Sequence, residues 1–215
     1  MAWRGIGALL LLTVAGGGAG FYASALADQP AASSGIPAPA SAVAPSYPHD
    51  PPLQVFPDPD TPPLAPALPS RRVRLGQPPF DLSFPVPRGW TRVDLAGNEA
   101  TWAVQTNPLN TYVLRVEIVT SQHETIAVTK AARISALDSA TQDFDVESET
   151  DDGFVATYVK DSYRRLTYHR WITFDDPDPG QGQGSTYAEI AMTGRLGDRT
   201  GMADLLDRVA DGATR

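Results

Sequence analysis

Apolar and polar residues alternate along much of the second half of the chain, with the period of two that is typical of β-strands. The pattern is clearest over residues 112–120, where Leu114 and Val116 share one side and Arg115 and Glu117 share the other. Further strands are predicted at 80–84, 100–106, 154–163, 164–175 and 187–196. Since these strands follow one another through short turns such as Asp152-Gly153, they predict an antiparallel sheet.

Two stretches have the helical period instead. Ser121 and Glu124 form a capping-box pattern, and a helix is predicted from there to about residue 140. Asp198 or Thr200 can cap a last helix that stops at Gly212. The residues predicted to be buried are Ala127, Ala131, Ile134 and Leu137 in the first helix and Met202, Leu206 and Val209 in the second. The pattern predicts an α+β fold, an antiparallel β-sheet with helices packed on it.

Every odd position from 143 to 151 is acidic. In a strand these side chains point to one side. Such a row suits an edge strand whose charges oppose sheet-to-sheet association. The alternative is an acidic face for a cation or a basic partner.

The N-terminal segment, residues 1–27, has one positive charge at Arg4 and then an uncharged, mainly apolar run. It reads as a signal peptide with a possible cleavage site at Ala25 and Ala27, or as a transmembrane anchor that is not cleaved. In both cases the rest of the chain is expected outside the cytoplasm.

Residues 28–77 are rich in Pro, Ala and Ser, with little periodic apolar pattern before residue 70. A segment of this composition cannot bury enough surface to offset the entropy of ordering, so we expect a disordered, extended linker. The globular domain is then expected over residues 78–215.

The composition excludes several classes of function. With no cysteine, the chain has no disulfide, no thiolate nucleophile and no site for a lipoprotein's lipid. A formal net charge of −8 disfavours a nucleic-acid partner, which needs clustered Lys and Arg. No phosphate-binding glycine loop and no hydrolase or zinc motif is present, so neither a cofactor nor a metal is expected.

One strand holds a local run of positive and titratable side chains in this acidic chain. We interpret this run as a possible partner surface, formed by Arg164, Arg165, His169 and Arg170. Tyr and Trp residues of the predicted strands are candidates for the lining of a pocket, although aromatic residues on strands usually belong to the core.

The segment FDLSFPVPRGW at 80–90, the long strand at 112–121, and the stretches 153–175 and 187–209 resemble a family of actinobacterial envelope proteins. These are proteins of the LpqN and alanine/proline-rich fibronectin-attachment antigen type, which have a PsbP/Mog-like domain. The resemblance implies an antiparallel sheet between helices and a non-enzymatic role in binding other proteins. The chain departs from that family in having neither a lipobox cysteine nor a proline-rich C-terminal tail.

We therefore expect an extracytoplasmic, non-catalytic binding or scaffold protein of the bacterial cell envelope. Its partner is expected to be a protein of the envelope or outside the cell. It would be held in the cell membrane by one span, or secreted after cleavage. The alternative is an envelope hydrolase, or a protein that binds a small molecule or lipid in an aromatic-lined pocket. A cavity with converging polar groups would favour the alternative, and a filled core the first hypothesis.

Overall fold

The computed structural model describes residues 52–104, 112–120, 124–174 and 184–215. The chain divides into two units, Met1–Asp50 and Pro51–Arg215, and all described residues belong to the second. The predicted N-terminal segment, with Ala25 and Ala27, lies outside the described residues. Within the described ranges, no helix is long and apolar enough to cross a membrane.

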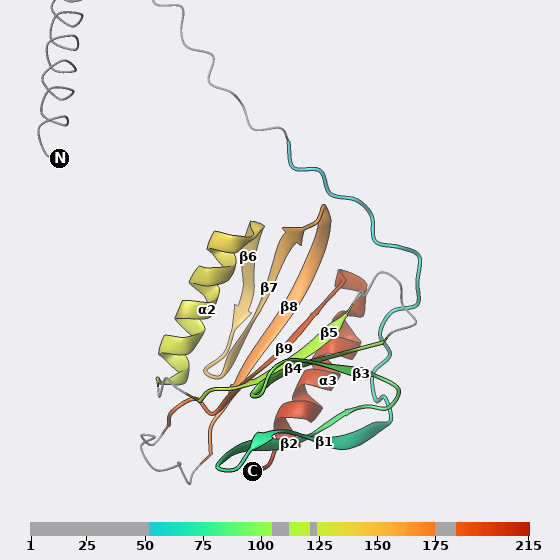
Figure 1. Ribbon diagram of the computed structural model, residues 1–215. Helices are drawn as coiled ribbons and strands as arrows, with labels where there is room; N and C mark the ends of the chain where they lie inside the picture. Colours follow the sequence, from blue (N-terminus) through green and yellow to red (C-terminus); the bar gives the residue numbers. More distant parts are fainter. Residues whose placement is uncertain (1–51, 105–111, 121–123, 175–183) are drawn as a thin grey trace, which may run out of the picture. The chain divides into compact units, whose positions relative to one another are not determined.

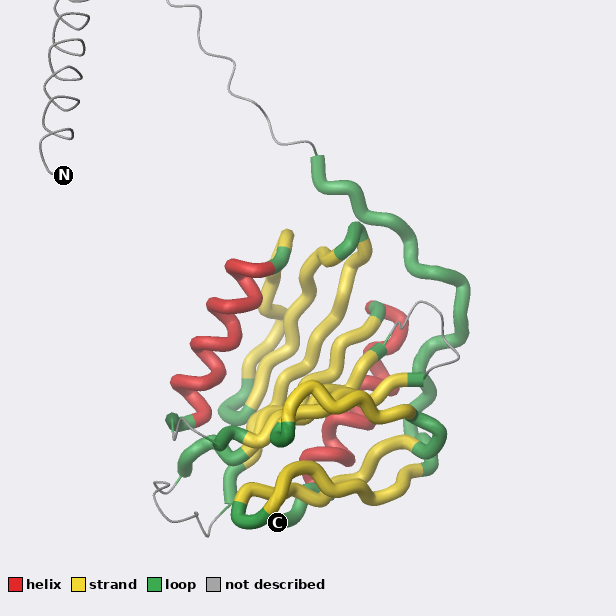
Figure 2. The backbone as a smooth tube through the Cα atoms, in the orientation of Figure 1, coloured by secondary structure: helices red, strands yellow, loops and turns green. Residues whose placement is uncertain are grey.

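The domain is built on a seven-stranded sheet whose strand order is β3-β4-β5-β9-β8-β7-β6 (Figures 1 and 2). All neighbouring strands are antiparallel. A separate antiparallel ribbon is formed by β1 (Ser70–Gln77) and β2 (Phe80–Pro87). The strands of the large sheet are β3 (Thr91–Ala96), β4 (Glu99–Ala103), β5 (Val113–Ile118), β6 (Gln142–Glu149), β7 (Gly153–Lys160), β8 (Tyr163–Ile172) and β9 (Ala188–Gly194). The prediction of an α+β fold with an antiparallel sheet is confirmed.

Short turns set the register of the last strands. The β7–β8 hairpin turns on Asp161 and Ser162, which both have positive φ (52° and 63°), as a two-residue turn of this hand requires. Gly153 begins β7 where a Cβ atom would lie 2.4 Å from the carbonyl oxygen of His169. Glycine is therefore needed there because the two strands approach too closely for any side chain.

Helix α3 (Arg199–Asp211) follows a 3-10 turn (Leu196–Asp198) and packs on β8, β9 and β2. Its buried residues include the three predicted ones, Met202, Leu206 and Val209. They meet even-numbered residues of the central strands, such as Leu166 and Ile190, in the main core. This side of the sheet is called the α3 face below.

Helix α2 (Ile126–Ala140) covers the opposite side, the α2 face, near β6 and β7. The prediction for its packing was partly wrong: Ile134 and Leu137 approach the sheet, whereas Ala127 and Ala131 are exposed. The alanines lie on the outward side of the helix, and no residue of α2 is fully buried. The predicted cap Ser121 lies outside the described residues, and Thr125 occupies the N-cap position.

The predicted disordered linker needs correction at its C-terminal end. Residues 70–77 form β1, and residues 52–69 run along the domain as a docked segment (Figure 1). Leu64 of this segment is only 5% exposed and joins the main core. Its amide nitrogen donates to the Asp198 carboxylate at 2.8 Å. The residues of the linker before 52 lie outside the described residues.

The docked segment is held largely through its carbonyl groups. Arg195 donates to the carbonyl oxygens of Pro59, Thr61 and Pro62, at 3.0–3.2 Å. Proline lacks an N–H but keeps its carbonyl, so a buried guanidinium suits a proline-rich partner. Helix α3 comes closest to the docked segment at Gly201, where a Cβ atom would lie 2.1 Å from the carbonyl oxygen of Leu64.

The acidic row on β6 is not one-sided. A register shift between Val146 and Ser148 breaks the alternation, so that neighbouring odd positions reach different partners. Glu147 pairs with Arg199 of α3 at 2.7 Å, and Glu149 with Lys130 of α2 at 3.4 Å. The prediction that this strand lies at the edge of the sheet is confirmed.

Candidate functional site

The four residues predicted as a partner surface do not share one surface. They lie on β8, where successive side chains point to opposite faces. Arg164 and Arg170 therefore lie on the α3 face, and Arg165 and His169 on the α2 face. His169 is buried, with 7% of its surface exposed.

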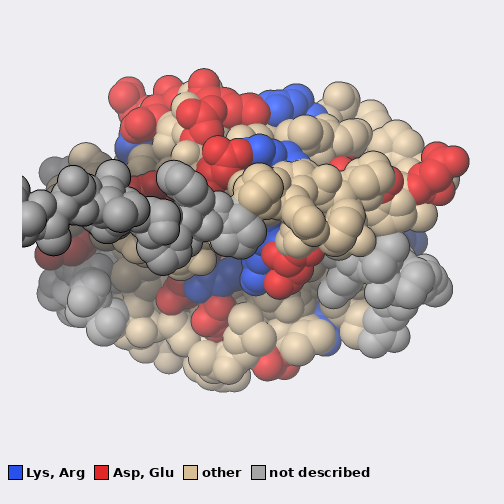
Figure 3. All heavy atoms as spheres, turned by 90° about the horizontal axis from the view of Figure 1, so that it is seen from above, with Lys and Arg blue, Asp and Glu red and all other residues tan. Residues whose placement is uncertain are grey.

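Each of the four also has an acidic partner that is distant in sequence. Arg164 pairs with Asp143, Arg165 with Asp58 and Arg170 with Asp152. His169 pairs with Glu189. On the face of the molecule seen in Figure 3, Lys and Arg side chains in general lie close to Asp and Glu side chains. The local positive run is thus neutralised by the fold.

A buried polar network lies on the α2 face around Glu189 of β9. Its Oε1 accepts from His169 Nδ1 at 2.7 Å, and its Oε2 accepts from Arg133 of α2. Arg115 of β5 lies 3.8 Å from the same carboxylate and also pairs with Glu99 and Glu117. Three strands and a helix therefore meet at one buried charge.

The charge states of Glu189 and His169 follow from their burial and from the charged groups beside them. Burial opposes ionisation of Glu189, but His169 and Arg133 outweigh it and lower the pKa of Glu189 to about 2. Burial lowers the pKa of His169, although Glu189 acts in the opposite direction. A neutral His169 therefore donates from Nδ1 to ionised Glu189. Its Nε2, 3.1 Å from Thr167 Oγ1, is left to accept from that hydroxyl.

The order Thr167–His169–Glu189 is the order of groups in hydrolase triads, but the arrangement is closed. Thr167 is only 1% exposed, and its hydroxyl also lies 3.2 Å from Thr193 Oγ1. The imidazole stacks on Phe154, with ring centroids 4.7 Å apart. A substrate carbonyl has no path to the hydroxyl, so this chain of hydrogen bonds holds the sheet and does not form an accessible nucleophile.

A small polar cavity of about 200 Å³ adjoins the network between α2, β5 and β9. Glu117 and Glu189 line it, and both pair with Arg133, which lines it too, and with Arg115. Each of its charged groups is thus already in an ion pair.

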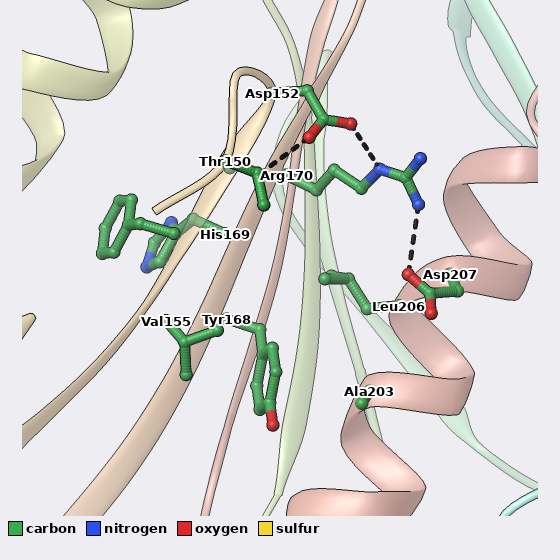
Figure 4. Close-up of a pocket in the computed structure, with 11 residues that line it drawn as sticks. Thr150, Asp152, Val155, Tyr168, His169, Arg170, Ala203, Leu206 and Asp207 are labelled. Atoms are coloured by element: carbon green, nitrogen blue, oxygen red, sulfur yellow. Dashed lines mark hydrogen bonds and ion pairs between the residues drawn. The ribbon is translucent and has the colours of Figure 1, made fainter. Parts of the chain in front are cut away.

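A larger cavity of about 340 Å³ opens on the α3 face, between β7, β8 and α3 (Figure 4). We call it the α3 pocket. Val155, Tyr168, Ala203 and Leu206 provide apolar lining, and Arg170 lies toward one end. Tyr168 and His169, neighbours on β8, point in different directions, so the imidazole is turned away from Leu206 and α3 (Figure 4).

Acidic groups converge on Arg170 at that end. Its Nε donates to Asp152 at 2.8 Å and its Nη1 to Asp207 at 3.1 Å, while Nη2 lies 3.2 Å from Asp211. Burial opposes ionisation of Asp152, but hydrogen bonds from Thr150 and Arg170 outweigh it and lower the pKa of Asp152. Asp152 is therefore ionised at neutral pH.

The aromatic residues considered as pocket lining are mostly core. Tyr168 lines the α3 pocket, and burial raises the pKa of its hydroxyl. Trp102, Trp171 and Tyr187 are fully buried, and Tyr163 packs against Phe56 of the docked segment.

The α3 pocket could not be found from local sequence, because Asp152, Arg170 and Asp207 come from a turn, a strand and a helix. The only local signal is the pair Asp207 and Asp211, four residues apart on the last helix. Among the described residues, no group of three or more His, Asp or Glu side chains is arranged to hold a metal ion.

Comparison with known proteins gives little beyond the fold. No family model matches the sequence, and no curated protein matches it. The chain is similar to the solution structure of cyanobacterial PsbP (CyanoP) from Synechocystis sp. PCC 6803. The match has 12% sequence identity and a TM-score of 0.42, and covers 66% of this chain and 91% of that one. This neighbour bears the name of the fold that the sequence resemblance implies.

Proposed function

We propose that this protein is a non-catalytic binding protein of the bacterial cell envelope, with its domain outside the cytoplasm, and that it binds a partner protein through the α3 pocket. The observation that supports this most is the cavity of about 340 Å³ beside α3, apolar along its length and charged at one end. Ligand and partner sites combine apolar lining with a few placed polar groups in this way.

The opposite face argues for binding over catalysis. The His–Glu pair that could serve a hydrolase is enclosed, and its Thr167 hydroxyl is 1% exposed. In the α3 pocket the imidazole of His169 is turned away from α3, and the one hydroxyl–carboxylate pair among the described residues that line it, Thr150 with Asp152, has its carboxylate bound by Arg170. Its volume is at the low end of small-molecule pockets, which run from about 300 to 1,000 Å³, so a long acyl chain does not fit.

The place in the envelope rests on the N-terminal segment of the sequence. Kinship with the LpqN and fibronectin-attachment type is part of the same proposal. Its motif has a local structural role: Gly89 turns the chain at φ 81° after β2, and Trp90 is buried and stacks on Tyr112, with ring centroids 5.5 Å apart.

The test is photo-crosslinking in cells that produce the full chain. A photo-reactive residue replaces Val155, which lines the α3 pocket, or Val128, which is exposed on the opposite side of the domain. We expect a discrete adduct with an extracytoplasmic protein from position 155 only, and its loss when Ala203→Trp fills the pocket. Adducts from position 128 alone would overturn the pocket as the binding site, and adducts with cytoplasmic proteins would overturn the location.

A further inference from the structure

The end of the α3 pocket has more negative than positive charge. Asp152, Asp207 and Asp211 surround Arg170, the one Lys or Arg among the described residues that line the cavity. Three carboxylates against one guanidinium leave a local excess of two negative charges. The surrounding basic residues do not cancel it, because Arg208 pairs with Asp204 and Arg199 with Glu147.

The hydrogen-bonding capacity of these groups is equally one-sided. The guanidinium of Arg170 directs Nε, Nη1 and Nη2 each at a different carboxylate, so few of its N–H groups remain for an anionic ligand. Each carboxylate has about four acceptor positions. Asp207 lines the pocket, and Asp211 is joined to it through the shared partner Arg170. The two side chains are 66% and 69% exposed, so their remaining acceptor positions are open. The pocket end therefore offers acceptors to a donor with a positive charge.

The rest of the pocket suits an aliphatic chain. Val155 and Leu206 present methyl groups, Ala203 leaves room over α3, and the Tyr168 ring lies alongside (Figure 4). Lysine has this combination, an apolar stem of four methylene groups with an ammonium at its end.

We propose that the α3 pocket receives a lysine side chain of the partner protein, its stem against Val155 and Leu206 and its ammonium bound by Asp207 and Asp211. This inference rests on the proposed function, since it names the group that the proposed binding site recognises. The two carboxylates attract the ammonium, and the apolar lining packs against the stem. The same negative charge disfavours acidic side chains, so the contact gives specificity as well as affinity.

The experiment uses the full chain with the photo-reactive residue at position 155, purified in micelles. Three biotinylated peptides of sequence Gly-Leu-Xaa-Leu-Gly serve as probes, in which Xaa is Lys, Gln or Glu. We expect the Lys peptide to crosslink roughly tenfold more than the Gln peptide, as one charge-assisted hydrogen-bonded contact implies, and the Glu peptide least. The preference should fall as salt is raised, because the carboxylates are exposed.

Substitutions then assign the effect to the two carboxylates. Asp207→Asn together with Asp211→Asn should remove the preference for Lys over Gln. Asp138→Asn on α2, an exposed acid away from the pocket, should leave it unchanged. Circular dichroism spectra verify that the variants are folded. If the double variant does not fold, the single Asp207→Asn variant replaces it and is expected to lose part of the preference for Lys.

The outcomes separate this inference from the proposed function. Equal labelling by the Lys and Gln peptides, or preference for Glu, would overturn the lysine contact while leaving the pocket a binding site. A Lys preference that survives the double substitution would overturn the assignment to Asp207 and Asp211. If all three peptides crosslink to position 155 no more than to position 128, both the lysine contact and the proposed binding site are overturned.

Discussion

The two faces of the large sheet are covered by helices that attach in different ways. On the α3 face, α3 buries six of its thirteen residues, five of them in the main core. On the α2 face, α2 buries none completely, and Arg133 and Lys130 tie it to the sheet through Glu189 and Glu149. One helix is held mainly by apolar packing and the other largely by charge.

The difference separates the residues that supply most of the free energy of unfolding from those that make it depend on pH and salt. Apolar burial is proportional to area and changes little with pH or salt. Ion pairs and a buried imidazole respond to pH. We therefore expect substitutions on the α3 face to cost the most free energy of unfolding, and those on the α2 face to decide how stability depends on solution conditions.

The largest effect is expected from truncation in the α3 core. Met202→Ala removes a side chain that is completely buried and should lower the free energy of unfolding by about 3 kcal/mol. Leu137→Ala, the matched change on α2, should cost about 1 kcal/mol because Leu137 is only partly buried. Denaturant unfolding of both variants measures the two losses of free energy. Equal losses would contradict the contrast between the faces.

The second-largest loss of free energy of unfolding is expected when the charge of Glu189, at the centre of the α2 face, is removed. Glu189→Gln keeps the shape but leaves Arg133 and His169 without a carboxylate, at a cost of about 2 kcal/mol near pH 7. The cost stays below that of a fully buried pair because Arg133 is about a third exposed. Glu117→Gln, a more exposed member of the same network, is the control and should cost less than half as much. The reverse order in denaturant unfolding would show that Glu189 is not the centre of the network.

Acidification should weaken the domain through the same network. The pKa of His169 is lowered in the folded state, so the unfolded chain binds the proton more tightly, and stability falls as pH decreases below about 6.5. A single residue can contribute at most about 1.4 kcal/mol per pH unit. Glu189, whose pKa drops from 4.5 to about 2, adds a further loss below pH 4.5.

Stability measured against pH checks this. In His169→Gln the decrease between pH 6.5 and 5 should become shallower, since the amide can still donate to Glu189 but does not titrate. An unchanged slope in that variant would assign the acid sensitivity to other groups.

The smallest effect is expected where α3 reaches the edge strand. Glu147→Gln breaks the pair with Arg199, which is 46% exposed, and should cost about 0.5 kcal/mol or less. Thermal unfolding at low and high salt measures it. A loss of 2 kcal/mol would mean that this ion pair holds α3 in place, contrary to the apolar attachment described above.

Local patterns predicted the elements that are held by apolar burial. Apart from β1 and β3, the strands follow from the alternating pattern, and α3 follows from the spacing of Met202, Leu206 and Val209. The packing side of α2 followed only in part, through Ile134 and Leu137, because its contacts with the sheet also include Arg133 and Lys130, which a search for apolar faces ignores.

The docked segment and the candidate site were missed for a different reason. A proline-rich stretch reads as unable to bury apolar surface, yet Leu64 and the carbonyl groups near it dock on Arg195 and Asp198, more than 130 residues away. Likewise Asp152, Arg170 and Asp207 meet only after β7, β8 and α3 are in place. Contacts across such separations leave no periodic trace in one sequence.

The two edges of the sheet differ, and this restricts the symmetry of any assembly built through them. Strand β6 ends the sheet with acidic side chains, whereas β3, at the other end, exposes Val93 and Leu95 (54% and 56%). A filament that grows by adding strand to strand needs the two edges to accept each other, head to tail. Pairing of β3 with β3 of a second copy, about a two-fold axis, would use one edge of each copy and leave β6 as the outer edge of both. Such pairing would end at a dimer, because charged side chains on an edge strand disfavour the addition of a further strand.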